Sequence, residues 1–220
     1  MGDPADGEGR HAVTGRERIV SAARGGETDF VPVVRALGAS GSKADAIVVA
    51  AGEVAGLAGG DAAVLAHVLS PLGRAVRSGV PLVALLHEDV EKGGAVLERL
   101  TDEARSEMLT ALANGADGVF YELDGAYPAV TTPMEYGGHF LEIDRKLLTE
   151  VEGARFNMLF VCGQEEPYID FVCDLPAHAF AWDARSGVDA AYVRTVRDGA
   201  LACEGGEFRL ATNDHAGVRA

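Results

Sequence analysis

Basic side chains are scarce in this sequence. Its 220 residues include 19 Lys and Arg against 34 Asp and Glu, which gives a formal net charge of -15. A surface of that sign repels the phosphates of nucleic acids and the headgroups of anionic lipids. Nucleic acids and membrane surfaces are therefore not expected as partners.

Long apolar runs and paired cysteines are also missing. No segment approaches the roughly 20 apolar residues that a membrane span needs. The polar start, MGDPADGEGRHAV, lacks the apolar core of a secretory signal. Three scattered cysteines, Cys162, Cys173 and Cys203, contain no CxxC pair and predict reduced thiols rather than a disulfide framework. We therefore expect a soluble, cytoplasmic protein.

The glycines do not form a phosphate-binding loop. Although the chain has 28 of them, no GxxxxGK[ST] occurs, and no GxGxxG opens a helix after a strand. The motifs of nucleotide binding are thus absent, and no cofactor is identified from the sequence.

Apolar segments are plentiful, at 48% hydrophobic residues, and they alternate between strand and helix patterns. Strands are expected at residues 31–34, 45–51, 80–86, 117–123, 158–161, 178–182 and 199–203. Helices are expected at residues 16–26, 61–79 with a kink at Pro71, 101–115, 139–153 and 188–196.

This alternation predicts an α/β fold, either a (β/α) TIM-barrel-like domain or a doubly wound sheet. A single domain is expected at residues 14–210, with a disordered tail at 1–13 and a C-terminal tail at 211–220. A full eight-stranded barrel usually needs about 250 residues. The barrel is therefore expected to be trimmed, or to be completed by something else.

Candidate site residues follow three of the predicted strands. Cys162 ends one strand and Asp183 the next, while Glu122 and Asp124 flank the end of the strand at 117–123. Ligands bind at the carboxyl ends of strands in such folds, so a thiol and several carboxylates are expected at one mouth. The alternatives are a small buried thiol and solvated loop carboxylates.

Two further side chains are assigned to the binding of substrate. Trp182 is expected to form an apolar wall that perturbs the carboxyl group of Asp183. His139 follows a helix start at Thr132 that Gly137 and Gly138 interrupt, and this broken segment is interpreted as a lid over the mouth.

Several of these patterns together resemble the uroporphyrinogen decarboxylase superfamily, which includes the methyltransferases of cobalamin-dependent systems. They are RERIVSAARGGETDFVPV, GADGVFYEL, TTPMEYGGHFLEIDRKLL, NMLFVCG and PAHAFAWD. The resemblance implies a TIM-barrel-like fold that is shortened at the C-terminus, because it ends near Gly206.

The methyltransferase branch of that superfamily usually carries a His two positions before the Cys of the LFVCG strand, and this pair helps to bind zinc. Phe160 occupies the His position here. Because Phe has no lone pair, Cys162 keeps too few partners for a zinc site unless Cys203 contributes. No metal ligands are therefore assigned.

The decarboxylase branch implies an arginine after the first strand, which holds substrate carboxylates, and an acidic residue after the second. Arg35 matches the first position, and Glu53 is the only carboxylate near the second. Both are assigned to substrate binding.

The resemblance implies an enzyme that acts as a carbon-carbon lyase of the decarboxylase kind or as a C1 or methyl transferase. Its substrate is expected to be a small or tetrapyrrole-like ligand. Cys162, Asp183 and Glu122 are the expected catalytic residues. The alternative is a noncatalytic barrel subunit, which would complete its fold by forming a homo-oligomer or by binding a partner subunit.

Overall fold

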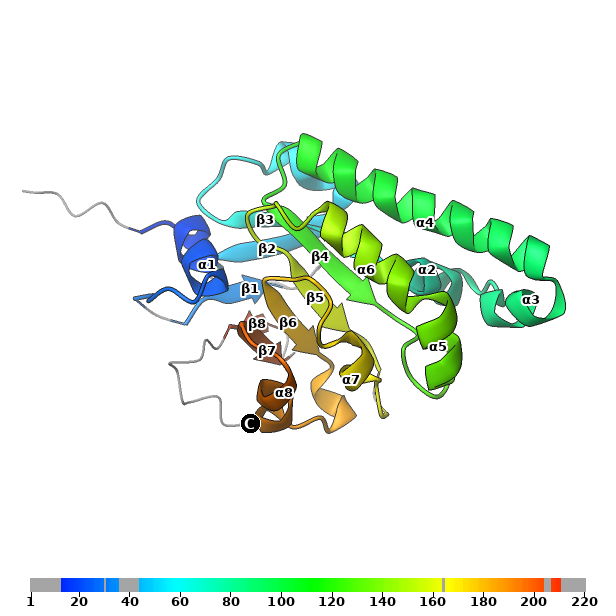
Figure 1. The fold of residues 1–220 in the computed structure, drawn as a ribbon. Helices are drawn as coiled ribbons and strands as arrows, with labels where there is room; N and C mark the ends of the chain where they lie inside the picture. Colours follow the sequence, from blue (N-terminus) through cyan, green and yellow to red (C-terminus); the bar gives the residue numbers. More distant parts are fainter. Residues whose placement is uncertain (1–12, 30, 36–43, 164, 204–206, 211–220) are drawn as a thin grey trace, which may run out of the picture.

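One eight-stranded sheet organises the part of the chain that the structure describes, which is residues 13–29, 31–35, 44–163, 165–203 and 207–210. The structure is a computed structural model, drawn as a ribbon in Figure 1. Apart from Val13, the two predicted tails lie outside the described residues.

Seven parallel strands follow one another around this sheet in chain order. The eighth pairs antiparallel with β1 and also lies close to β7, so the sheet forms a nearly closed barrel. The prediction of a TIM-barrel-like α/β fold is confirmed. The strands are β1 (Val33–Arg35), β2 (Ala46–Ala50), β3 (Ala63–Leu69), β4 (Gly118–Leu123), β5 (Met158–Val161), β6 (Ala179–Trp182), β7 (Ala200–Cys203) and β8 (Glu207–Arg209).

Alternate side chains of these strands fill the barrel, as the two-residue period of a strand requires. Three phenylalanines, Phe120 of β4, Phe160 of β5 and Phe208 of β8, meet with ring centroids 5.5 to 5.8 Å apart. Smaller inner residues, such as Ala181 and Ala202, leave room for these rings. The aromatic cluster forms a solid apolar floor beneath the carboxyl ends of the strands.

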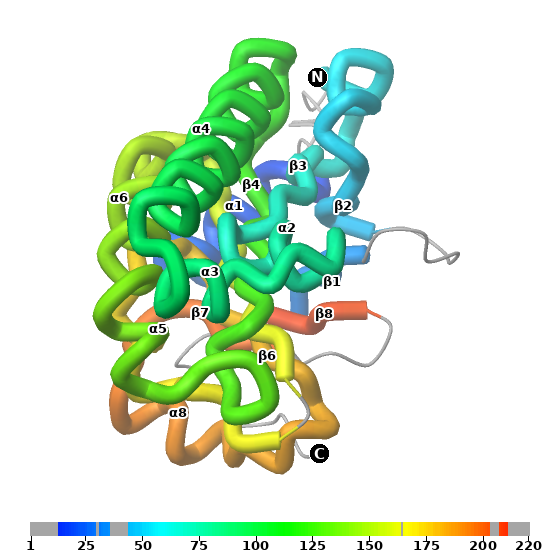
Figure 2. The backbone as a smooth tube through the Cα atoms, turned by 90° about the vertical axis from the view of Figure 1, so that its right-hand side faces the viewer, coloured from blue at the N-terminus to red at the C-terminus, as the bar shows by residue number. Residues whose placement is uncertain are grey.

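The other face of the sheet is covered by helices, whose apolar residues form the larger core cluster. The helices α4 and α6 lie along the outside, as both ribbon and tube views show (Figures 1 and 2). No helix among the described residues is both long and apolar enough to cross a membrane. The helices are α1 (Gly15–Ala23), α2 (Pro71–Ser78), α3 (Leu82–Glu88), α4 (Val90–Ala113), α5 (Pro133–His139), α6 (Leu141–Glu150), α7 (Ile169–Val172) and α8 (Ala190–Val196), with 3-10 turns η1 (Ala51–Gly56) and η2 (Ala184–Ser186).

The helix α1 closes the amino end of the barrel. Ile19 is fully buried in the inner cluster. Arg18 pairs with Asp45 at the start of β2, and Arg16 Nε lies 2.9 Å from Asp117 Oδ1 before β4. Among the described residues, α1 therefore covers the amino end of the barrel, and the carboxyl end is the end that it leaves open.

The sequence-based prediction is wrong between residues 61 and 88. The expected kinked helix at 61–79 is the strand β3 followed by α2, and the expected strand at 80–86 is the helix α3. Ser70 caps α2, since its Oγ accepts a hydrogen bond from Gly73 N at 3.0 Å, and Pro71 occupies the first turn instead of kinking a helix. A short apolar run fits the two-residue period of a strand as well as the 3.6-residue period of a helix. Tertiary packing therefore decides which of the two forms.

The structure adds one strand that the sequence pattern does not predict. No strand is expected after residue 203, but Phe208 and Leu210 are buried, and β8 pairs with β1 through Val33↔Arg209, Val34↔Phe208 and Arg35↔Glu207. A three-residue strand is too short to show a period in the sequence. Its pairing covers the free edge of β1.

A buried carboxyl group joins the helices α5 and α6 to the barrel wall. Asp144 of α6 is 1% exposed and accepts hydrogen bonds from the hydroxyls of Tyr121, at 2.6 Å, and Tyr136, at 2.8 Å. Burial raises the pKa of Asp144 to about 6, although both hydrogen bonds favour the ionised form. Folding therefore favours its protonated form.

This raised pKa predicts a pH-dependent loss of stability that Asp144→Asn abolishes. The carboxyl group has a pKa of ~3.9 in the unfolded chain and about 6 in the folded protein. Its contribution to the free energy of unfolding is therefore about 3 kcal/mol smaller at pH 7 than below pH 4, and most of this loss occurs as the pH rises from about 4 to about 6. Urea unfolding of both proteins at pH 4, 5 and 7 measures the difference between them. A difference that stays constant with pH would contradict the assignment, because the packing cost of the amide does not titrate.

Candidate site at the carboxyl end of the barrel

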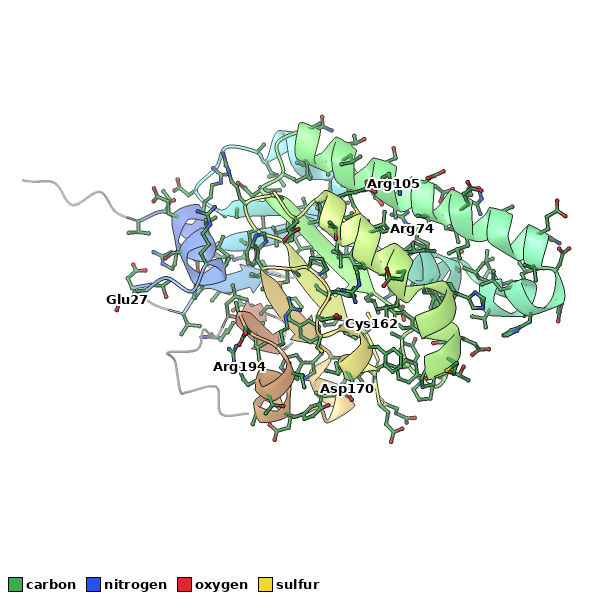
Figure 3. The ribbon with its side chains drawn as sticks, in the orientation of Figure 1. Glu27, Arg74, Arg105, Cys162, Asp170 and Arg194 are labelled. Carbon is green, nitrogen blue, oxygen red and sulfur yellow. The ribbon has the colours of Figure 1, made fainter. Side chains whose placement is uncertain are left out.

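The candidate site lies at the carboxyl ends of β3, β4 and β5. His67 and Glu122 are inner residues two positions beyond Leu65 and Phe120, which belong to the barrel interior. Cys162 follows β5 at the next inner position after Phe160, and Figure 3 shows it at the end of that strand. Strand alternation therefore brings an imidazole, a carboxylate and a thiol above the aromatic floor.

Glu122 is the centre of this group. Its Oε2 accepts a hydrogen bond from His67 Nε2 at 2.5 Å. Its Oε1 accepts one from the Arg77 guanidinium and another from Cys162 Sγ at 3.2 Å. Three donors from β3, α2 and the end of β5 thus fix the carboxylate of Glu122, whose side chain is only 12% exposed.

Asp124 forms the second part of the same network. Arg77 Nε donates to Asp124 Oδ2 at 2.9 Å, and the Tyr127 hydroxyl donates to Oδ1 at 2.9 Å. Gly125 follows with a φ of 101° and lies against the side chain of Leu72, where a Cβ would come within 2.6 Å. Only glycine suits this turn, which directs Asp124 toward Arg77.

Asp183 lies at the same mouth, after β6. Its carboxylate accepts from Arg185 Nε at 2.9 Å and from the same guanidinium's second nitrogen at 2.7 Å. The Arg185 hydrogen bond lowers the pKa of Asp183 and outweighs the effect of burial. Asp183 is therefore held as a carboxylate.

The charges in this network hold Glu122 ionised and Cys162 protonated. Burial alone would raise the pKa of Glu122, but hydrogen bonds from His67 and Cys162, with the charge of Arg77, lower it overall. Burial raises the pKa of the Cys162 thiol far above its ordinary value, and the carboxylates of Glu122 and Asp124 add to the rise. Cys162 is thus a hydrogen-bond donor in this state and not a thiolate.

These groups line a pocket of ≈ 480 Å³. Its lining includes Phe160 and Tyr127 on the apolar side, together with four carboxylates and two guanidinium groups, so its formal charge is -2. The volume is in the range of small-molecule sites. The charged lining residues are Arg77, Glu122, Asp124, Glu165, Asp183 and Arg185.

The structure brings together four of the eight residues predicted from the sequence. Glu122, Asp124, Cys162 and Asp183 all line the pocket. They share it because their parallel strands end at one edge of the barrel. Their roles remain predictions.

The other four predicted residues lie elsewhere. Arg35 pairs in register with Ile47, on the face of the sheet opposite to the inner residue Val34. Glu53 is exposed on η1. None of these four lines the pocket.

Trp182 and His139 differ from expectation for separate reasons. Trp182 belongs to the outer core and donates to the Val188 carbonyl at 3.2 Å, because adjacent strand residues face opposite sides. It therefore does not form a wall at the pocket beside Asp183. His139 is exposed at the end of α5, with its ring 6.4 Å from that of His87.

Sequence reasoning missed five polar residues of the site: His67, Arg77, Tyr127, Glu165 and Arg185. His67 and Arg77 both fall within the helix that the sequence predicts at 61–79, and this prediction hides the position of His67 on a strand. A clearer signal was the pair Ser70-Pro71, which is typical of a helix start and separates a strand from a helix. Arg185 follows Asp183 by two residues, within reach of a local turn.

The pocket also contains three groups that could ligate a metal. Donor atoms of Glu122, Asp124 and Cys162 all lie within 4.8 Å of one another. The zinc that the family resemblance implies would instead use a His at position 160, but Phe160 is packed in the aromatic floor. Both carboxylates are also bonded to Arg77. The residues present do not fit that zinc site.

Fold and site together define a nearly closed α/β barrel with a small polar pocket at its carboxyl end. No protein-family model and no curated protein matches the sequence. Among solved structures, the chain is similar to a methyltransferase from Methanosarcina mazei, with 16% identity and a TM-score of 0.55. The match covers 65% of this chain and 43% of the methyltransferase, so this chain spans less than half of that protein. At this identity the similarity supports a barrel of the same kind and concerns the fold alone.

Proposed function

We propose that this protein is an enzyme that transfers a methyl or other one-carbon group between small molecules at the barrel mouth. The observation that carries the proposal is the position of the Glu122 carboxylate at the pocket, where it accepts hydrogen bonds from His67, Arg77 and Cys162. This carboxylate is ionised and can take a proton from a bound acceptor, although its lowered pKa makes it a weaker base than an ordinary glutamate. The barrel's similarity to a methyltransferase agrees with this class.

The proposed step has a simple balance. The lone pair of an acceptor X–H forms the new X–CH₃ bond, and the bond from the methyl group to its donor breaks with its electrons left on the donor. The proton from X–H passes to Glu122 Oε2, the oxygen that bonds to His67, while Oε1 keeps its bonds to Arg77 and Cys162. A positioned base of this kind contributes about 10²- to 10⁴-fold to the rate.

The remaining groups position this base and the ligand. His67 and Arg77 each hold one oxygen of Glu122, which fixes the plane of the carboxylate. Cys162 acts as a further donor to Glu122 in this scheme, since its raised pKa opposes a role as the methyl acceptor. Phe160 offers an apolar surface for the transferred group.

A carbon-carbon lyase reaction of the decarboxylase kind is the second candidate. The two guanidinium groups at the mouth, Arg77 and Arg185, favour it because they suit a substrate carboxylate. The net negative charge of the pocket and the ionised state of Glu122 favour transfer instead. A tetrapyrrole-like ligand would extend beyond a pocket of ≈ 480 Å³.

A paired assay tests the proposal. Methylcobalamin, as a tetrapyrrole-like donor, and methylated amines, as small donors, are incubated with a small thiol, and the methylated thiol is measured by mass spectrometry. Carbon dioxide release from small polycarboxylates is measured in parallel. We expect enzyme-dependent methylation of the thiol. Release of carbon dioxide without methylation would show that the protein is a carbon-carbon lyase instead.

Absence of both products would favour the noncatalytic alternative, in which the chain is a partner-binding subunit. That alternative predicts a homo-oligomer or a complex, which light scattering after size exclusion detects. The strand β8 already pairs with the edge of β1, so a partner chain is not required to cover that edge of the sheet.

A further inference from the structure

We infer that Arg77 is the resident cation of this pocket and occupies the place between Glu122 and Asp124 that a metal ion would otherwise take. The guanidinium bonds to both carboxylates at once, with Nε 2.9 Å from Asp124 Oδ2 and a second nitrogen on Glu122 Oε1. A planar guanidinium is suited to such a bridge because its donors have fixed directions. The inference concerns metal content and does not depend on the proposed reaction.

The donor atoms of the cluster are already engaged. Glu122 Oε1 accepts from both Arg77 and Cys162, while Oε2 accepts from His67. Zinc would need ligand distances of about 2.0–2.3 Å and a deprotonated Cys162. Binding would therefore require the guanidinium to leave and the thiol to lose its proton.

The fold places Arg77 for this role and leaves its outer side free. The helix α2 begins at the Ser70 cap beside β4, since Ser70 N donates to the Glu122 carbonyl at 2.9 Å, and it ends at Gly79 with a φ of 71°. The Arg77 side chain is 54% exposed, whereas those of Glu122 and Asp124 are 12% and 6% exposed. Removal of the guanidinium would leave two buried carboxylates beside a thiol, which is a strongly cation-binding arrangement.

Zinc content tests the inference. Wild-type protein, Arg77→Met, Arg77→Lys and the double variant Arg77→Met with Cys162→Ala are purified without chelator and dialysed against micromolar zinc. Metal per chain is then measured by mass spectrometry. We expect little zinc in wild type and Arg77→Lys, stoichiometric zinc in Arg77→Met, and its loss in the double variant.

Arg74→Met is the matched control. Arg74 lies on the same helix and pairs with Glu107 of α4, and Figure 3 shows it away from Cys162. It is expected to leave zinc content unchanged. Circular dichroism verifies that each variant folds, and Arg77→Gln replaces Arg77→Met if the latter does not.

Two results would overturn the inference. Stoichiometric zinc in wild type that Cys162→Ala removes would show that the cluster takes a metal despite Arg77. A folded Arg77→Met or Arg77→Gln that stays free of zinc would show that Arg77 is not what excludes it. Both readouts are independent of methyl transfer, so they leave the proposed function to its own assay.

Discussion

Glu122→Gln is expected to lower the rate of methyl transfer by about 10²- to 10⁴-fold, because the amide cannot take the acceptor's proton. Gln has the shape of Glu, so packing above the aromatic floor is retained. The same change removes a negative charge next to Cys162, which lowers the pKa of that thiol. Steady-state kinetics measure the first effect.

The second effect needs no substrate. Alkylation of Cys162 by iodoacetamide should become faster in Glu122→Gln, because a lower thiol pKa increases the fraction of Cys162 that is present as the reactive thiolate. Peptide mass spectrometry separates this cysteine from Cys173. Glu107→Gln is the control, since Glu107 also accepts from an arginine but lies outside the pocket. Unchanged activity and alkylation in Glu122→Gln would refute its central role.

Gly118→Ala is expected to prevent the barrel from folding stably. A Cβ at this position would lie 1.8 Å from the carbonyl oxygen of Phe156 and 2.5 Å from its carbon. Since both atoms are backbone, β4 and the start of β5 would have to separate. A clash of this kind belongs with the rare substitutions that cost more than about 4 kcal/mol.

Gly94→Ala provides the matched comparison. Gly94 lies within α4, and its added Cβ would meet nothing within 4 Å. Alanine there should stabilise the protein by about 0.5–1 kcal/mol. Urea unfolding of the two variants measures both effects. A Gly118→Ala protein as stable as wild type would show that β4 and β5 are not held as closely as the structure indicates.

Much of the barrel was predictable because buried parallel strands are short, continuous apolar runs. The run at 117–123 became β4, and the runs at 158–161 and 178–182 became β5 and β6. The failure at residues 61–88 has the same origin, since AVLAHVL reads equally as strand or helix. The Ser70-Pro71 pair marks the boundary between β3 and α2, but the apolar spacing of residues 65–76 also fits one continuous helix.

The sequence by itself determined which carboxylates and which thiol lie at the ends of strands. A polar residue after an apolar run marks a strand end, and this local pattern does not depend on what the strand packs against. Glu122, Asp124, Cys162 and Asp183 were found in this way. The tertiary structure alone decided their partners. Glu122 meets His67 and Arg77 across 55 and 45 residues of sequence. Such contacts depend on barrel closure and on side-chain direction, which no local pattern encodes, and they hold Glu122 ionised and Cys162 protonated.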